Sequence, residues 1–402
     1  MMTVMGPGAQ IDFALAADPA APLLPGPAFH DHLRELRDRA PIVDATMLGI
    51  PCRLITRYAE LDAAFRDDEG FPAGPTYATT IEPCQGVTFE SVDGHEHHVL
   101  RDLSTRELRA RPVARFAATH VGSLADELID GFVADGGGDL VELFTARFPF
   151  HVFGRRMGLP DDRRDAYFGW SFDILGYPGD QARGLAAAAE LTAYTEPVLA
   201  RRRACPVADL PDDMLSSMVT AENRGRSLND EEILSHVRAI FAAGASTTHH
   251  GLGNTLYALL THPEALERLR ADPSLIPAAV DEMLRWEPPL GVLPRIAPFD
   301  TVVAGEEVAE GTFVLMGIAS ANRDERVHTD PDTFAIDRRP TRVLTFGFGS
   351  HHCPGTHLAK AQISIGIERL LARLPRLRLT DPTAAQPVGA ILRGPRAIPV
   401  DW

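Results

Sequence analysis

One short stretch combines a cysteine with residues that could make it a metal ligand. Residues 346–360, FGFGSHHCPGTHLAK, hold one cysteine among three histidines and three glycines, in a chain that has only four cysteines. A cysteine ligand has to be a thiolate, which backbone N–H groups, a helix N-terminus and nearby positive charge all favour. Cys353 directly precedes a helical pattern, so this stretch is suited to hold an anionic sulfur against a metal.

The residues around Cys353 are typical of a tight loop that enters a helix. Gly347 and Gly349 permit positive φ before the cysteine, and Pro354 suits the first helical position. Gly355 lets another backbone or a flat ligand approach without a Cβ in the way. A buried core cysteine beside a glycine-rich turn is the commoner explanation for a lone cysteine. The order of the surrounding residues favours the ligand.

That order resembles the haem-binding signature of the cytochrome P450 family, Phe-Gly-x-Gly-x-His-x-Cys-x-Gly-x-x-Leu-Ala. Every defined position matches: Phe346, Gly347, Gly349, His351, Cys353, Gly355, Leu358 and Ala359. The resemblance implies that Cys353 is the axial thiolate of haem b iron, that His351 reaches a haem propionate, and that Phe346 packs beside the sulfur. A thiolate ligand pushes electron density onto iron and favours O–O cleavage.

Three cationic residues elsewhere match the positions at which the family binds the propionates. His97 and Arg101 are spaced i, i+4 on one face of a predicted helix, and Arg295 stands on a predicted strand after the EPP turn. Taken singly, Arg101 is better explained as a surface charge and His97 as a satisfied polar histidine. Beside the Cys353 signature, the resemblance implies that all three bind haem.

A second group of charged residues fits a structural network. Glu282 and Arg285, in DEMLRWEPP, stand three residues apart on one helix face, and Arg338 comes from a later loop. A surface ion pair is the ordinary explanation of such spacing. The family buries a Glu-x-x-Arg pair and a remote arginine on the cysteine side of the haem, so the resemblance implies that role. A bidentate pair of this kind contributes geometry more than net stability.

The residues expected on the opposite side of the haem depart from the family's pattern. The family has Ala/Gly-Gly-x-Asp/Glu-Thr-Thr/Ser on its long central helix, and residues 243–248 of this chain read AGASTT. Gly244 would leave room for oxygen, and Thr247 matches the family's distal hydroxyl. Ser246 stands where the acid usually does, and its hydroxyl can relay a hydrogen bond but supplies no titrating carboxylate. These three are the predicted catalytic residues.

Three explanations for the serine are open from the sequence. A water chain or a nearby histidine, His249 or His250, replaces the acid; or the enzyme is slower and leaks peroxide; or its natural oxidant is peroxide. We favour the first explanation, because Thr247 is present and histidine titrates near neutral pH.

The distal residues lie in the middle of a long predicted helix. Asn229 and Glu232 form a capping-box pattern, apolar residues then recur at helical spacing, and Pro263 stops the pattern. At about 1.5 Å per residue, such a helix crosses a whole domain. It should therefore be central.

The other patterns predict a mainly α protein with small β-sheets. Shorter helices are predicted over FHDHLREL, AELDAAFRD, PEALERLRADP and SLIPAAVDEMLRW, and a final one from beside Cys353 to about Arg373. CRLITRY and RIAPFDTVVAGEEVAEGTFVLMGI are typical of short strands, the second with a turn at Ala304 and Gly305. Residues 71–91 lack periodicity and predict a long loop.

One cytochrome P450 domain over residues 1–402 is the predicted organisation. Length alone would favour two or three domains. However, no repeat or linker-like composition divides the chain, and segments such as ANRDERVHTDPDTF also resemble bacterial members of the family. The haem is expected between the central helix and the final helix, and the first residues, about 20 in number, form a loosely ordered arm.

Composition and charge argue against several classes of partner. The formal net charge of −16 disfavours nucleic acid, which needs a basic face. No uninterrupted apolar run approaches the length needed to cross a bilayer, and the N-terminus lacks a secretory pattern. The four cysteines form no CxxC pair, which disfavours disulfides and zinc. We therefore expect a cytoplasmic protein with no membrane partner.

A local basic segment stands out from the acidic composition. RDLSTRELRARPVARF carries five arginines against one aspartate and one glutamate. In the family, this helix faces the redox partner, and an acidic ferredoxin suits a basic patch by electrostatic steering. A solvated helix face is the alternative. The resemblance implies electrons from NAD(P)H through a ferredoxin reductase and a ferredoxin.

The family's substrate contacts correspond to mostly apolar residues here, which predicts a small hydrophobic organic substrate. Any of them could equally be plain core. They are Val87, Trp170, Phe241, Ala242, Ala245, Leu290, Val292, Leu293 and Ile391.

The predicted function is that of a bacterial-type haem-thiolate monooxygenase, which inserts one oxygen atom from O2 by hydroxylation or oxidative dealkylation. A peroxide-driven or non-oxygenating haem-thiolate enzyme is one alternative, and a haem-binding sensor without turnover is another. They differ in whether reduced ferredoxin and oxygen, peroxide alone, or neither supports product formation.

Overall fold

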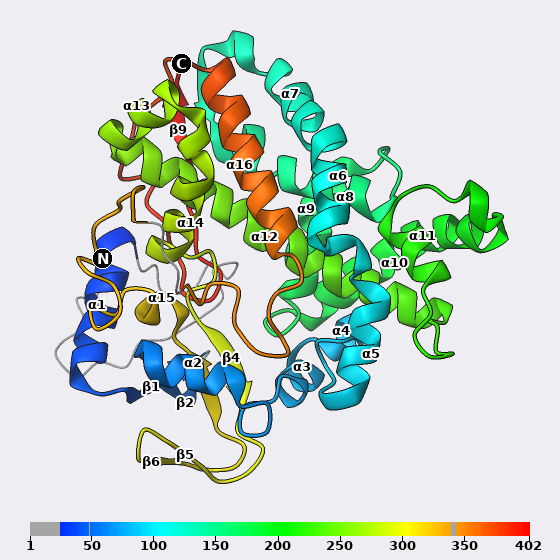
Figure 1. Ribbon diagram of the computed structural model, residues 1–402, viewed down its shortest axis with the longest axis horizontal. Coiled ribbons are helices and arrows are strands. Elements are labelled where there is room, and N and C mark those ends of the chain that lie inside the picture. The colour runs from blue at the N-terminus through cyan, green and yellow to red at the C-terminus, as the bar shows by residue number, and fades with distance from the viewer. Residues whose placement is uncertain (1–24, 48, 339–342) are drawn as a thin grey trace.

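Helices make up most of the chain in the computed structural model, which describes residues 25–47, 49–338 and 343–402 (Figure 1). The predicted N-terminal arm falls mostly outside these residues. The α-helices are α1 (Gly26–Arg39), α2 (Tyr58–Arg66), α3 (Gly74–Thr80), α4 (Glu82–Gln85), α5 (Gly94–Ser104), α6 (Ala110–Phe116), α7 (Gly122–Asp130), α8 (Phe148–Met157), α9 (Tyr167–Leu175), α10 (Gln181–Ala204), α11 (Met214–Thr220), α12 (Asp230–Thr261), α13 (Pro263–Ala271), α14 (Ile276–Trp286), α15 (Ile318–Ala321) and α16 (Thr356–Arg373).

The strands form small sheets, as predicted. They are β1 (Ile42–Met47), β2 (Ile50–Ile55), β3 (Gly137–Asp139), β4 (Leu293–Ile296), β5 (Thr301–Val303), β6 (Glu306–Val308), β7 (Phe313–Met316), β8 (Arg378–Leu379) and β9 (Pro399–Asp401). One sheet has the order β1-β2-β7-β4, another β3-β9-β8, and β5 pairs with β6. The turn of the last pair falls at Ala304 and Gly305, whose φ angles of 54° and 88° confirm the predicted turn.

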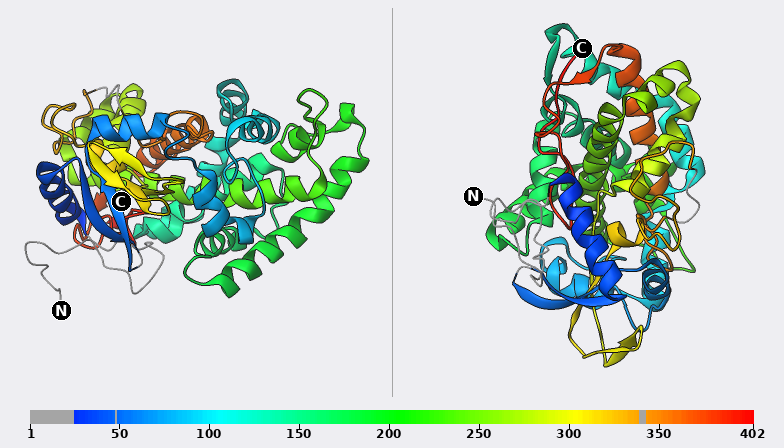
Figure 2. Two further views of the ribbon diagram at one scale, coloured as in Figure 1. Left: turned by 90° about the horizontal axis from the view of Figure 1, so that it is seen from below. Right: turned by 90° about the vertical axis from the view of Figure 1, so that its left-hand side faces the viewer.

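The long helix α12 is central, as its length predicts. Its capping box is present: the Glu232 N–H donates to Asn229 Oδ1 over 2.9 Å, and the Asn229 N–H donates to Glu232 Oε2 over 2.8 Å. Helices α8, α9 and α16 pack against it. In Figures 1 and 2, α12 runs through the helical part of the molecule, while the β1–β2 sheet and α1 lie to one side. None of the described helices is long and apolar enough to span a bilayer.

The predicted long loop over residues 71–91 instead contains two short helices, α3 and α4. Each has a proline in its first turn, Pro75 in α3 and Pro83 in α4. Proline fits the first helical turn because the N–H that it lacks would have no intrahelical acceptor there. These prolines therefore begin helices too short to show the periodicity whose absence predicted a loop.

Candidate active site

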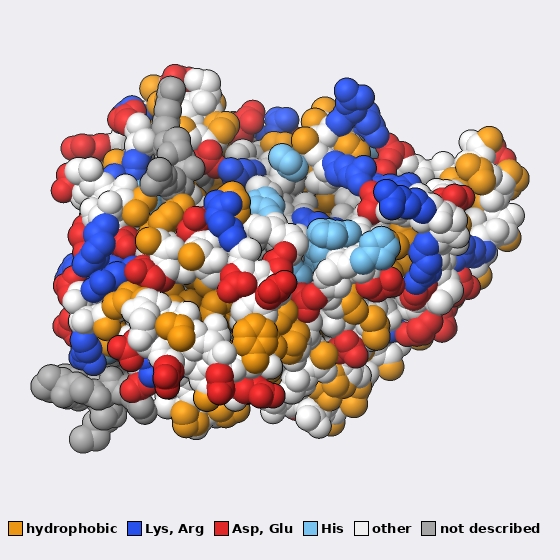
Figure 3. All heavy atoms as spheres, turned by 60° about the horizontal axis from the view of Figure 1, so that its bottom comes forward, with side chains coloured by type: hydrophobic (Ala, Val, Ile, Leu, Met, Phe, Trp, Pro, Cys, Tyr) orange, Lys and Arg blue, Asp and Glu red, His pale blue; other side chains and the backbone are white. Residues whose placement is uncertain are grey.

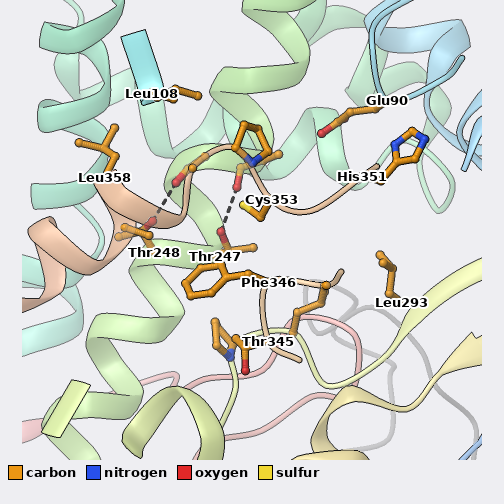
Figure 4. Close-up of a pocket in the computed structure, with 18 of the residues that line it drawn as sticks. Glu90, Leu108, Thr247, Thr248, Leu293, Thr345, Phe346, His351, Cys353 and Leu358 are labelled. Atoms are coloured by element: carbon orange, nitrogen blue, oxygen red, sulfur yellow. Dashed lines mark hydrogen bonds between the residues drawn. The ribbon is translucent and has the colours of Figure 1, made fainter. Parts of the chain in front are cut away.

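The loop before α16 is a tight turn that places Cys353 at a cavity (Figure 4). The Cys353 N–H donates to the carbonyl oxygen of Phe346 over 2.9 Å, which closes the turn. Gly347 and Gly349 have φ angles of 65° and 75°, as the sequence predicts. A Cβ on Gly349 would come within 2.3 Å of the carbonyl oxygen of Phe65, so the loop packs directly against α2.

The loop alone does not turn the Cys353 thiol into a thiolate. Burial raises the pKa of the thiol, although the Gly355 N–H and the Arg101 guanidinium act to lower it. A metal cation is the stronger influence, because a coordinated thiol is deprotonated outright. The loop therefore presents a sulfur that becomes an anion when a metal binds.

Helix α12 forms the opposite wall of the cavity. Its residues at the cavity are Ile240, Ala243, Gly244, Thr247 and Thr248, which share one helix face. The Thr247 hydroxyl donates to the Ala243 carbonyl oxygen over 3.0 Å, and the Thr248 hydroxyl donates to that of Gly244 over 2.9 Å. Figure 4 shows Cys353 and Thr247 on facing walls. Thr247 is thus placed where the sequence predicts a distal hydroxyl.

Gly244 lines the cavity, and its lack of a side chain also matters for packing. A Cβ at this position would come within 2.4 Å of the Phe153 ring. Phe153 itself lines the cavity. In this structure, the absence of a side chain at Gly244 lets α8 and α12 pack closely.

Ser246 and the two histidines after it do not line the cavity. Ser246 is fully buried and its hydroxyl donates to the Ala242 carbonyl oxygen over 2.9 Å, toward α9. Burial lowers the pKa of His249 to about 4 and lowers that of His250 well below its ordinary value. Both histidines are therefore neutral at pH 7, and the idea that one of them replaces the missing acid does not fit their positions.

The predicted propionate ligands differ in whether they line the cavity. Arg295 and His351 line it, and His351 Nε2 lies 3.0 Å from Asp93 Oδ1. Arg101 reaches the cysteine loop, where its Nη2 donates to the carbonyl oxygen of His352. Its Nη1 is buried without a hydrogen-bond partner.

His97 does not line the cavity. Its Nδ1 and Nε2 lie 2.6 and 3.1 Å from the carbonyl oxygens of Phe89 and Ser350. It is completely buried, so in this structure it ties the segment before α5 to the cysteine loop.

The predicted charge network is assembled. Arg285 donates two hydrogen bonds of 2.8 Å to the carboxylate of Glu282, and both residues are fully buried. Arg338 Nε donates to Glu282 Oε1 over 2.9 Å. Arg285 Nη1 also donates to the carbonyl oxygen of Pro331 over 2.8 Å. The network joins α14 to the loop that precedes the cysteine turn.

Most of the predicted substrate contacts lie away from the cavity. Leu290 and Leu293 line it. Phe241, Ala242 and Ala245 are fully buried and do not line the cavity, although Gly244 and Thr247 on the same helix do. The remaining four lie elsewhere: Val87 is 50% exposed, Val292 and Ile391 belong to the core beside α1, and Trp170 donates to Glu190.

The cavity also has lining residues that the sequence reading missed. All but Phe348, which fills an undefined position of the signature, come from segments without a motif, and all but Glu90 are aromatic: Phe65, Tyr77, Phe89, Glu90, Phe153 and Phe348. Residues 89–91, FES, precede the predicted helix that carries His97. This closeness to a predicted haem ligand was the one feature of the sequence that pointed to Glu90. Its direction into the cavity depends on how the loop folds (Figure 4).

A mainly helical fold with a cysteine loop facing a long helix across an apolar cavity defines a haem-thiolate protein. The sequence profile described as Cytochrome P450 matches residues 161–386. The chain is 35% identical over 361 residues to the mycinamicin IV hydroxylase/epoxidase of Micromonospora griseorubida, covering 87% of this chain and 89% of the relative. It is 31% identical over 368 residues to the vitamin D(3) 25-hydroxylase of Pseudonocardia autotrophica, covering 87% of both.

A solved structure has the same fold. The cytochrome P450 enzyme CxnD for C–S bond formation in chuangxinmycin biosynthesis superposes with a TM-score of 0.82 at 31% identity, covering 92% of this chain and 93% of that chain. The chain belongs to the cytochrome P450 family. It is a monooxygenase that uses haem b and incorporates oxygen from O2 into an organic substrate.

The residues at the cavity fit haem b. Cys353 offers a sulfur ligand, and Arg101 Nη1 is a buried donor that needs an anionic partner. Arg295, which lines the cavity, provides a second guanidinium, and both arginines act electrostatically on Glu90. Apolar side chains such as Leu358 and Ile363 provide walls for a flat hydrophobic ring. A buried, unpaired donor is costly, so a propionate would satisfy Arg101.

Proposed function

We propose that Cys353 is the axial ligand of the haem iron, and that Arg101, Arg295 and His351 bind the propionates. One observation carries this proposal: the Cys353 sulfur and the Thr247 hydroxyl belong to facing walls of one apolar cavity. Phe346 lines the cavity beside the cysteine, and Gly347 and Gly355 keep the loop free of further side chains. His97 acts indirectly, because it positions the segments before α5 and before Cys353.

Bound haem with a thiolate ligand supplies the oxygen-activating chemistry. The chain's own part is to exclude bulk water and to deliver protons. The apolar walls serve the first purpose. The Thr247 hydroxyl serves the second, since its oxygen can accept a hydrogen bond from a water molecule, and so hold that water in place, while its O–H donates to the Ala243 carbonyl oxygen. With Ser246 turned toward α9, a chain of waters is the route that supports this step.

The proposed electron donor is an acidic ferredoxin, reduced by NAD(P)H through its reductase. The basic patch that supports it consists of Arg106, Arg109, Arg111 and Arg115, of which the last three are exposed. Arg106 and Arg109 share Asp102 as an ion-pair partner, which leaves a net positive patch. Arg101, one turn away, touches the cysteine loop, so the patch lies close to Cys353. Figure 3 shows arginine and histidine side chains gathered on this side of the molecule.

Two further parts of the proposal concern the whole chain. One hydrophobic core joins residues between Cys84 and Leu284 to residues between Phe334 and Val400, which supports a single domain. A cytoplasmic location, where NAD(P)H and ferredoxins are available, completes the proposal. Cell fractionation with antibody detection tests the location.

The function is tested by reconstitution of the haem-loaded enzyme with ferredoxin, ferredoxin reductase and NADPH. Candidate substrates are first chosen by the spectral change that accompanies displacement of water from the iron. We expect product that carries one atom of labelled O2. Product formation from peroxide alone, with none from oxygen and ferredoxin, would overturn the proposal.

The ferredoxin patch has its own test. Charge reversal in Arg109→Glu with Arg111→Glu should weaken ferredoxin binding about tenfold or more at low salt, and the effect should shrink as salt rises. Arg201→Glu, at an exposed position on α10, is the matched control. Equal losses in the two variants would contradict docking at the patch.

A further inference from the structure

The active-site cavity is apolar on most sides but holds one acidic side chain. Among the described residues that line it, Glu90 alone is an aspartate or glutamate. Its neighbours along the wall include Phe89, Leu290 and Leu293. Figure 4 shows the carboxylate directed into the cavity, near His351. A carboxylate in such surroundings needs a partner.

No described residue supplies that partner. No hydrogen bond or ion pair to the Glu90 carboxylate forms within the described chain, although its own N–H is satisfied by the Thr88 hydroxyl over 3.2 Å. Arg295 and Arg101 act on it electrostatically without forming an ion pair. The carboxylate is therefore the one unpaired acid that a ligand in this cavity would meet.

Glu90 is held firmly on the α12 side of the cavity. The N–H of its neighbour Phe89 donates to His236 Nε2 on α12 over 3.2 Å, and the two rings stack with centroids 5.8 Å apart. The Phe89 carbonyl oxygen lies 2.6 Å from His97 Nδ1 on α5. Anchored on both sides, the segment cannot easily turn the carboxylate away. Glu90 thus belongs to the cavity wall that the segment before α5 forms, which Phe89 ties to α12 and His97 ties to the cysteine loop.

Haem binding leaves the Glu90 carboxylate with fewer cations to pair with. If Arg101 and Arg295 bind the propionates, as in the proposed function on which this step rests, their charge is matched by the cofactor. The Glu90 carboxylate then faces an apolar cavity whose nearby cations are already used. A carboxylate left in this state either takes up a proton or awaits a positive charge from the ligand.

We propose that Glu90 determines substrate specificity by binding a cationic nitrogen, and that the substrate is an apolar molecule that carries one protonated amine or quaternary ammonium group. The aromatic rings of Phe89 and Tyr77 in the same wall also suit a cation. The apolar remainder of the cavity fits the rest of such a molecule.

The ionisation of Glu90 gives the proposal a pH signature. Burial raises its pKa to about 7, although Arg295 and Arg101 act to lower it. The other titratable groups around it are Tyr77 on α3, and His351 and Cys353 on the cysteine loop. Because a carboxyl group is anionic above its pKa, binding of a permanent cation should strengthen as pH rises through about 7.

The experiment compares two ligands of nearly equal shape on haem-loaded enzyme. One is the trimethylammonium compound 4-phenylbutyltrimethylammonium, which cannot ligate iron and does not titrate. The other is its neutral isostere, 5,5-dimethylhexylbenzene. Equilibrium binding is measured by calorimetry between pH 6 and pH 8.5. We expect the cation to bind about tenfold or more tightly than the isostere at high pH, and less so below pH 7.

The Glu90→Gln variant should lose both the preference for the cation and its pH dependence. Glu96→Gln, whose carboxylate is 53% exposed on α5, should keep both. A haem content and carbon monoxide spectrum equal to wild type show that a variant is folded. A preference that survives in Glu90→Gln, or equal affinity of the two ligands in wild type, would overturn the inference. These outcomes leave oxygen-dependent product formation unaffected, so failure of this inference is distinguishable from failure of the proposed function.

Discussion

The two sides of the active-site cavity are built in different ways. On the cysteine side, a turn of fixed backbone geometry presents Cys353, and the fully buried Glu282–Arg285 pair braces the loop before it. On the α12 side, the hydroxyl groups of Ser246 and Thr247 are held only by carbonyl oxygens of their own helix. The acid at this side comes from a different element, as Glu90.

This difference shows which part of the chemistry each side fixes. The cysteine side depends on charge pairs and backbone turns, which tolerate little change, and it carries the function that all members of the family share. The α12 side depends on shape and on a single unpaired carboxylate. In the functions that we propose, it is therefore the side at which this chain selects its substrate and its route for protons.

Loss of one charge on the cysteine side should have the largest effect. Glu282→Ala leaves Arg285 buried without its carboxylate partner, which should lower the free energy of unfolding by about 3–5 kcal/mol. Urea unfolding of the haem-loaded protein measures this. Glu267→Ala, which removes an exposed pair with Arg270, should cost less than about 1 kcal/mol. Similar small losses in both variants would remove the contrast between the two sides.

On the α12 side, Thr247 should matter for coupling of oxygen use to product. Thr247→Ala removes the hydroxyl from the cavity wall, and we expect product formed per oxygen consumed to fall about tenfold to a hundredfold. Oxygen electrode and product assays measure the ratio. Thr247→Ser should restore most of it. Unchanged coupling in the alanine variant would show that protons arrive without this hydroxyl.

Acid should destabilise the α12 side through its buried histidines. Burial lowers the pKa of His249 and of His236 to about 4 each, from an ordinary value of 6.5. The unfolded chain therefore binds more protons below pH 6.5, and stability falls as pH drops from 6.5 toward 4. His249→Phe should reduce this slope by up to about 1.4 kcal/mol per pH unit. Unfolding curves across this window with an unchanged slope would refute the assignment of a neutral His249.

The smallest effect is expected at Ser246. Its hydroxyl donates within its own helix and does not line the cavity, so Ser246→Ala should change turnover by less than about twofold and leave the solvent isotope effect unchanged. Steady-state rates in light and heavy water measure both quantities. A large fall would mean that the proton route passes through Ser246 after all.

The cysteine side was predictable because its information is local in the sequence. Residues 346–359 form one continuous motif, and Glu282 and Arg285 lie one helix turn apart. The ends of α12 were likewise predictable from its capping box and from Pro263, since both act on neighbouring residues. In such segments, the backbone geometry follows directly from the types of neighbouring residues.

The α12 side was harder to predict for two physical reasons. Phe241 and Ala242 were predicted from the family's substrate contacts, yet Ile240 and Ala243 face the cavity. Because α12 is buried on nearly all faces, its hydrophobic pattern could not correct that prediction. Glu90 lies between α4 and α5, and its direction depends on a tertiary contact of its neighbour, the hydrogen bond from the Phe89 N–H to His236 on α12. Neither fact can be predicted from a single segment of the chain.

The ligation of iron by Cys353 is the central claim, and the spectrum of the reduced carbon monoxide complex tests it most directly. If Cys353 is the thiolate ligand, the haem-loaded wild-type protein will show the strongly red-shifted Soret band that thiolate ligation produces. Cys353→His should bind haem and lose that band. A wild-type spectrum without the red-shifted band, or a variant that keeps it, would contradict the account.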